Sequence, residues 1–153
     1  MTITIIGDLR YGRTVHSLLK LLQLYDVDIQ LLSPPALALP ADVKQDLEAS
    51  GRLLFEGSKL TKEIIGRSDV MYCTRLQKER FEDPTEYERL RGGLVVDGKA
   101  MMHAKEKMIV MHPLPRNEEI TEEVDFDLRA AYFRQMKYGM YCRMALLALV
   151  MAS

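Results

Sequence analysis

A chain of 153 residues with 48% hydrophobic content is long enough to form one domain with a substantial core. Its 21 basic and 22 acidic residues leave a net charge of -1, which excludes the globally basic surface that nucleic acids and anionic membranes require. The apolar run at residues 144–151 is too short to cross a bilayer, so we expect neither a nucleic-acid nor a membrane partner.

Apolar, strand-like runs alternate with helical patterns along the chain. Strands are expected at residues 2–6, 27–32, 52–55, 70–73, 93–96 and 108–111, and helices at residues 13–25, 41–50, 61–66 and 98–105. This alternation predicts the α/β class: a doubly wound, mainly parallel sheet flanked by helices, in a Rossmann-like arrangement. Residues 138–151 predict a long C-terminal helix, so apolar that we expect this sheet or a neighbour outside the chain to cover it.

The cysteines and the first residues bear on the cellular setting. Cys73 and Cys142 lie far apart and have no metal-ligand spacing, and we expect no secretory leader ahead of the first strand. We therefore expect two reduced thiols in a cytoplasmic protein, with neither a metal nor a cofactor. Strand-forming residues begin at Thr2, which fits a fragment of a longer polypeptide.

Three turns with unusual residues each follow a predicted strand, at residues 8–14, 74–80 and 112–116. In open parallel sheets, ligands bind beyond the carboxyl ends of the strands, which is where these turns should meet. Because all three turns are basic, the sequence predicts a site for a small molecule with several negative charges.

The first turn places Arg13 in the first turn of the predicted helix. A cation there opposes the positive end of the helix dipole unless an anion shares the position, and a guanidinium grips a carboxylate or phosphate with two parallel bonds. The alternative is a surface arginine. The segment also resembles a degenerate P-loop, but Arg13 stands where a lysine is required, and the two cations are not interchangeable. We expect His16, one turn further, to pack or cap rather than catalyse.

In the second turn, extended backbone would point Arg75 and Gln77 the same way. An arginine and an amide side by side can hold one carboxylate through several donors. Because charged residues continue to Arg80, a solvated turn is an equal alternative.

The third turn contains Pro113, Leu114 and Pro115. Its two prolines remove two backbone donors and leave carbonyl groups available to a ligand, and a cis X-Pro bond would aim them. A rigid connection to the next element is the alternative. His112 invites assignment as a general base, although a histidine beside a proline at a strand end is more often structural.

Taken together, the segments GDLRYGRTVHSL at residues 7–18, YCTRLQKER at 72–80, MHPLPRNEEI at 111–120 and RAAYFRQMKYGMYCRMALLALV at 129–150 resemble the aspartate-binding half of the aspartate carbamoyltransferase family. The resemblance covers nearly the whole chain. The motif sequences are more similar to those of eukaryotic multifunctional pyrimidine-synthesis proteins than to bacterial ones. It implies a single aspartate-binding domain over residues 1–153, with the carbamoyl phosphate domain absent from this chain, since no S-T-R-T motif is present.

The resemblance also implies a role for each matching residue. Arg13 would bind the α-carboxylate of L-aspartate, and Arg75 with Gln77 the β-carboxylate. The turn of Pro113, Leu114 and Pro115 would present backbone carbonyls to the carbamoyl and amino groups. The product is N-carbamoyl-L-aspartate, no complete catalytic set lies in this chain, and the full enzyme is expected to be a homotrimer with shared sites.

Alternatives and departures remain at this point. An ornithine carbamoyltransferase would carry H-C-L-P where this chain has residues 112–115, and a non-catalytic assembly module could use the same fold. Residues 125–129 read Asp-Phe-Asp-Leu-Arg, where the family has a small residue and a proline in place of Phe126 and Leu128. We expect this turn to be less rigid and more apolar.

Overall fold

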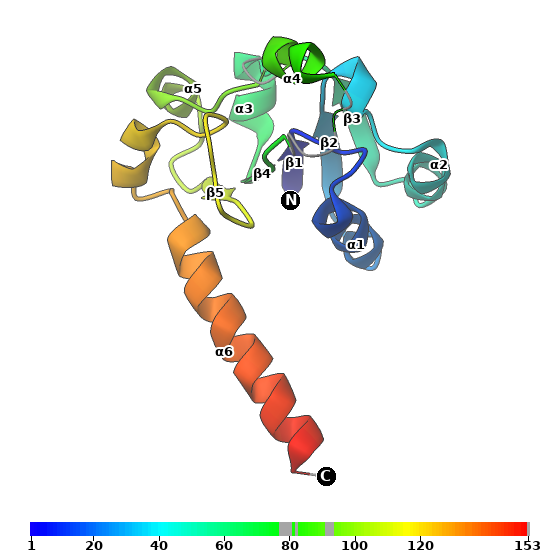
Figure 1. The fold of residues 1–153 in the computed structure, drawn as a ribbon, viewed down its shortest axis with the longest axis vertical. Helices are drawn as coiled ribbons and strands as arrows, with labels where there is room; N and C mark the ends of the chain where they lie inside the picture. Colours follow the sequence, from blue (N-terminus) through cyan, green and yellow to red (C-terminus); the bar gives the residue numbers. More distant parts are fainter. Residues whose placement is uncertain (77–80, 82, 91–93, 153) are drawn as a thin grey trace.

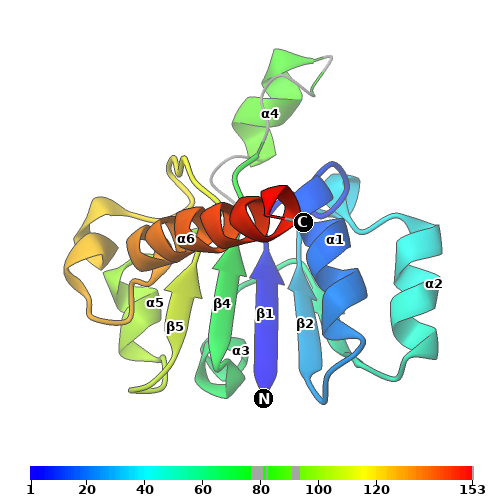
Figure 2. The same cartoon turned by 90° about the horizontal axis from the view of Figure 1, so that it is seen from below.

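A five-stranded parallel sheet forms the centre of the computed structural model, which describes residues 1–76, 81, 83–90 and 94–152. The strands are β1 (Thr2–Ile6), β2 (Asp28–Leu32), β3 (Leu53–Gly57), β4 (Val70–Cys73) and β5 (Ile109–Met111). Their order in the sheet is β3-β2-β1-β4-β5 (Figure 2). This order confirms the predicted doubly wound α/β class, because the chain builds outward from β1 in both directions.

Helices cover both faces of the sheet (Figures 1 and 2). One face packs against α1 (Arg13–Leu22) and α2 (Ala41–Ala49), and the other against α3 (Lys62–Arg67), α5 (Gly98–Met102) and the 3₁₀ helix η3 (Glu122–Phe126). A second 3₁₀ helix, η1 (Pro35–Leu37), follows β2, and α4 (Pro84–Leu90) projects beyond the carboxyl ends of the strands. The chain ends in α6 (Tyr132–Met151).

The strand positions follow from burial on both faces. In β1 and β2 the four residues after the first are all buried, and except for Gln30, which bonds Thr4, these buried residues are apolar or β-branched. Ile5 and Leu31 pack on the α1 side, whereas Ile6 and Leu32 pack on the α3 side. Alternate residues thus feed two separate cores, as the two-residue period of a strand requires.

Side-chain caps begin two of the short helices. Thr61 accepts a hydrogen bond from the amide of Ile64 at 3.4 Å, and Asp97 accepts one from the amide of Ala100 at 2.8 Å. Each cap satisfies an amide that has no partner inside the first helical turn. The predicted helices at 61–66 and 98–105 therefore exist, although the second ends at Met102.

The expected strand at residues 93–96 is wrong. Within the described part of this segment, only Val96 forms a bridge, and its partner is Ile120 rather than a strand of the sheet. The sheet position beside β5 is taken instead by the segment before α6, where Ala130 pairs with Val110. Residue 93 lies outside the described residues.

Helix α6 begins at Tyr132, ahead of the expected start at residue 138, and extends away from the body of the domain (Figure 1). Tyr132 is fully buried, but Leu149 and Val150 are each 72% exposed. The sheet of this chain therefore does not cover the apolar helix, which corrects one of the two expected arrangements. Among the described residues, no helix is both long and apolar enough to cross a membrane.

The variant turn before α6 keeps its ionic core. Asp127 binds the guanidinium of Arg129 through both carboxylate oxygens, at 2.9 and 2.7 Å, and this pairing holds the pKa of Asp127 below its usual range. Phe126 and Leu128 point outward and are 89% and 92% exposed. The two departures from the family pattern thus add apolar surface without touching the three basic turns.

Candidate functional site

The three basic turns meet at the carboxyl edge of the sheet, where the topology changes direction. β1 and β4 are neighbours in the sheet. After β1 the chain enters α1 on one face of the sheet, whereas after β4 it continues towards α5 on the other face. Such a switch point leaves a crevice outside the strand ends because the two connections diverge. The turn after β5 lies at the same edge of the sheet (Figure 2), and its residues 112–115 line a pocket there.

A pocket of about 160 Å³ lies in this crevice. It is lined by Gly12 and Thr14 at the start of α1, Thr74 and Arg75 after β4, and residues 112–115 after β5. Pockets that enclose a whole small molecule are usually larger, about 300–1,000 Å³. The size therefore suits one part of a site that another element completes.

Four of the six residues singled out in the sequence line this pocket together: Arg75, Pro113, Leu114 and Pro115. Arg13 is exposed on the first turn of α1, between the two α1 residues of the lining, and is not part of the lining itself. Gln77 lies outside the described residues. The structure thus brings all three turns to one place, as the sequence predicts.

The local electrostatics favour a negatively charged ligand. The first turn of α1 contains no acidic residue, and its amino end carries a partial positive charge. Arg75 adds a full positive charge to the lining, and Arg13 lies on the first turn of α1, whose neighbours Gly12 and Thr14 also line the pocket. A carboxylate or phosphate in this pocket would therefore be stabilised from two directions.

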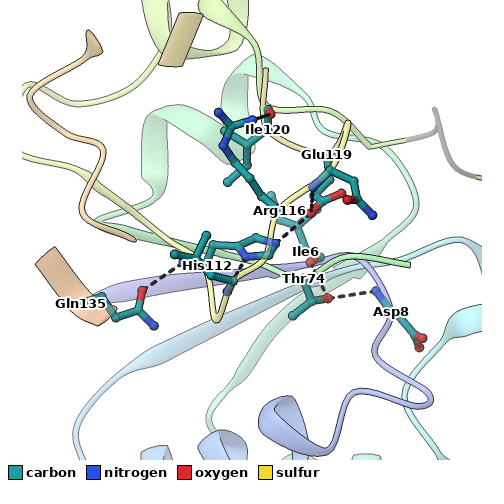
Figure 3. Close-up of polar contacts among 10 residues, drawn as sticks. Ile6, Asp8, Thr74, His112, Arg116, Glu119, Ile120 and Gln135 are labelled. Carbon is teal, nitrogen blue, oxygen red and sulfur yellow. Dashed lines mark hydrogen bonds and ion pairs between the residues drawn. The ribbon is translucent and has the colours of Figure 1, made fainter. Parts of the chain in front are cut away.

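Buried polar contacts fix the first turn against β4. The amide of Asp8 donates to Thr74 Oγ1 at 3.1 Å, and Thr74 Oγ1 donates to the carbonyl of Ile6 at 3.1 Å (Figure 3). Asp8 is fully buried, and its carboxylate accepts a hydrogen bond from the amide of Tyr11 at 2.8 Å. A buried carboxylate inside the loop opposes a bound polyphosphate, which argues against the P-loop interpretation. His16 bonds the carbonyl of Leu9 at 2.8 Å and is therefore structural.

The third turn has an unusual backbone. The Leu114–Pro115 peptide bond is cis, the isomer considered in the sequence analysis, and Leu114 has a φ of 56°. Non-glycine residues seldom occupy this left-handed region, so the turn needs neighbouring contacts to hold it. His112 provides one, because its Nδ1 accepts a hydrogen bond from the amide of Leu114 at 2.8 Å.

Glu119 is the residue that sequence reasoning missed. Its Oε1 lies 2.9 Å from His112 Nε2 and accepts a hydrogen bond from the amide of Asn117 at 2.9 Å (Figure 3). Burial alone would raise the pKa of Glu119, but the hydrogen bonds from His112 and Asn117 outweigh it and lower the pKa. The available signal was a glutamate seven residues after the histidine, within the quoted motif.

A second ionic cluster anchors the end of the turn. The guanidinium of Arg116 donates to the carbonyl of Ile120 at 3.0 Å and pairs with Asp125. Asp125 also accepts a hydrogen bond from the hydroxyl of buried Tyr132, whose pKa is raised by burial and by this contact. The turn is therefore tied both to η3 and to the first residue of α6.

Comparison with known proteins gives consistent matches. The family model described as Aspartate/ornithine carbamoyltransferase, Asp/Orn binding domain, matches residues 1–150. The multifunctional protein pyr-3 of Neurospora crassa is 62% identical in an alignment 153 residues long that covers 99% of this chain and 8% of that protein. The aspartate carbamoyltransferase catalytic subunit of Clostridium botulinum, strain Alaska E43, is 48% identical over 148 residues, 96% of this chain and 48% of the subunit.

Solved structures agree with these matches. Aspartate transcarbamoylase from Trypanosoma cruzi in complex with carbamoyl phosphate is 49% identical, with a TM-score of 0.87 over 96% of this chain and 48% of that chain. The same enzyme in complex with aspartate and phosphate is 49% identical, with a TM-score of 0.82 over 96% and 46% of the two chains. This chain therefore spans about half of the single-function relatives and a small part of the multifunctional ones.

Proposed function

The chain belongs to the aspartate/ornithine carbamoyltransferase family, as its Asp/Orn-binding domain, and from this we propose that it is the aspartate-binding half of an aspartate carbamoyltransferase. The full protein would transfer the carbamoyl group of carbamoyl phosphate to the amine of L-aspartate, as a step of pyrimidine synthesis. The observation that carries the proposal is the meeting of Arg75 with the turn of residues 112–115 beside the amino end of α1.

The proposed roles follow from the chemistry of the lining. Arg75, with Gln77 close by in sequence, binds the β-carboxylate of L-aspartate, and Arg13 on the first turn of α1 binds its α-carboxylate. Backbone carbonyls of the turn of Pro113, Leu114 and Pro115 orient the amine and the carbamoyl group. Two charged ends held in this way leave the amine free to face the second substrate.

The reaction then needs orientation and charge stabilisation rather than a covalent enzyme intermediate. The amine nitrogen attacks the carbamoyl carbon, the tetrahedral species loses phosphate as the C–O bond breaks, and the amine releases a proton. Holding the two reactants in line supplies much of the rate gain in such bimolecular transfers. The product is N-carbamoyl-L-aspartate.

The domain that binds carbamoyl phosphate is proposed to pack on α6. Most of this helix is exposed and apolar beyond its first turn, including Leu146 and Leu147, each 62% exposed. An apolar helix of this size rarely stays in water when a partner domain is available. Residues 1–153 are accordingly proposed to be one aspartate-binding domain within a longer chain.

We also propose an oligomeric state and a cellular location for the full protein. The homotrimer with sites shared between subunits rests on the family resemblance. The cytoplasmic location rests on the two free thiols, Cys73 in the core and Cys142 on α6.

The decisive assay uses the full-length polypeptide that contains this chain. With carbamoyl phosphate present, we expect product formation with L-aspartate and at most trace formation with L-ornithine. Ornithine carries an ammonium in place of the second carboxylate, so Arg75 would repel it. Carbamoyl transfer to ornithine at the higher kcat/KM would overturn the substrate assignment.

A further inference from the structure

His112 lies at the end of β5, 1% exposed, and all its polar atoms on the ring and the amide are engaged. Its backbone amide donates to Gln135 Oε1 on α6 at 3.0 Å. Its ring bonds the amide of Leu114 on one side and the carboxylate of Glu119 on the other (Figure 3). Although His112 lines the pocket, both of its ring nitrogens are bonded within the protein, so neither is available to exchange a proton with a substrate.

The hydrogen-bond pattern fixes the tautomer. The amide of Leu114 can only donate, so Nδ1 of His112 must be the unprotonated acceptor. The ring hydrogen then resides on Nε2 and is donated to Glu119. Glu119 thus orients the imidazole, and the imidazole presents its lone pair to the turn.

That lone pair meets the only amide hydrogen available between residues 113 and 115. Pro113 and Pro115 have no N–H group, so Leu114 supplies the only donor by which these residues can be anchored through the backbone. Leu114 is also the residue with a φ of 56°. The His112 ring therefore holds the part of the turn that most needs a fixed conformation.

We propose that His112 and Glu119 form a positioning pair for carbamoyl transfer, in which Glu119 fixes the imidazole and the imidazole fixes the backbone of Leu114 in the pocket with Arg75. This inference rests on the proposed function and adds two residues that act through the turn rather than directly on a substrate. The turn that they hold would orient the reacting amine and carbamoyl group, so the pair acts on orientation. The carboxylates of L-aspartate would be held elsewhere, by the arginines.

The test measures kcat and KM for L-aspartate in the full-length polypeptide. We expect His112→Ala to lower kcat by about 10- to 100-fold, since a misplacement of about 1 Å near the reacting atoms costs this much. The KM for L-aspartate should change far less. His112→Asn should recover most of kcat, because Asn Oδ1 lies three bonds from Cα, as Nδ1 does, and can accept the same hydrogen bond from Leu114.

Two variants of Glu119 test the other half of the pair. Glu119→Gln keeps an oxygen that accepts the hydrogen on Nε2, so kcat should stay near that of the wild type. Glu119→Ala removes the acceptor and should lower kcat in the same way as His112→Ala. In the double variant His112→Ala/Glu119→Ala, the loss of kcat should be smaller than the product of the two single losses, since both changes release the same turn. If His112→Ala does not fold, His112→Asn and the Glu119 variants still decide the question.

Ser68→Ala is the matched control, because Ser68 is also fully buried and donates to the carbonyl of Ile64 at 2.8 Å, but at the amino edge of the sheet. It should lower thermal stability and leave kcat unchanged. An active wild type with equally active His112→Ala or Glu119→Ala would overturn the positioning role alone. A wild type that makes no N-carbamoyl-L-aspartate would overturn the proposed function.

Discussion

Thr74 lies directly against the backbone of Gly7, so close that a β-carbon on Gly7 would stand 2.6 Å from Thr74 Oγ1 and closer still to the Thr74 carbonyl oxygen. Gly7, with a φ of 117°, directly follows β1, and Thr74 directly follows β4. The two strand ends that border the pocket are therefore locked together at a point where only glycine fits.

Gly7→Ala is expected to destabilise the domain by on the order of 3 kcal/mol, because it combines a strained φ with a backbone clash. Gly51→Ala is the matched control. Gly51 also has a positive φ, 69°, but nothing lies within 4 Å of its missing β-carbon, so its cost should be about 1 kcal/mol. Urea unfolding of the two variants measures the difference, and equal losses would contradict the close approach.

Arg75→Ala should reduce kcat/KM for L-aspartate by on the order of 3 kcal/mol, which is about a hundredfold, through the loss of charge-assisted hydrogen bonds. Steady-state kinetics of the full-length polypeptide measures this loss. Arg67→Ala, which removes an exposed arginine at the end of α3 near the amino edge of the sheet, should leave it unchanged. Unaltered kinetics in Arg75→Ala would remove this residue from the site.

Folding lowers the pKa of Glu119, so its ionised form is favoured in the folded state. This contribution to stability is complete above the ordinary glutamate pKa of about 4.3 and is lost as the pH falls through the lower value of the folded protein. The stability advantage of wild type over Glu119→Gln should therefore be constant near neutral pH and shrink as the pH falls below about 4.3. Urea unfolding across this range measures it, and a difference independent of pH would contradict the assignment.

The chain of residues 1–153 on its own should not produce N-carbamoyl-L-aspartate, because its pocket of about 160 Å³ holds only one side of the proposed site. A colorimetric assay for carbamoyl-aspartate with the purified chain measures this, with the full-length polypeptide as the positive control. Circular dichroism of the same sample shows whether the chain is folded. Turnover by the isolated chain would contradict the division of the site.

Local patterns predict most of the fold because burial acts on short segments. β1 and β4 have the predicted bounds, since apolar and β-branched residues fill each run from end to end. The segment before Val96 has the same composition but forms no strand in its described part, because the place beside β5 belongs to Ala130. Competition for one sheet edge is a tertiary effect that a local pattern does not contain.

The candidate site also has a part that local sequence predicts and a part that only the tertiary structure reveals. The basic turns were evident because arginines and prolines at strand ends are unusual, and the switch-point rule placed them together. The partnership of His112 with Glu119 was not evident, because it depends on how the chain folds back after Arg116. Helix α4 was also missed, although Asp83 accepts a hydrogen bond from the amide of Thr85 at 2.8 Å just ahead of its first turn.

The hydrogen bond from the His112 amide to Gln135 couples α6 to the end of β5. The helix is the surface on which we place a neighbouring domain, and its first turn holds the end of β5. A shift of that neighbour would pull on the helix and reach the strand end through a single side chain. Movement of a domain packed on α6 would thereby change the shape of the pocket beside β5, with no hinge required inside the sheet.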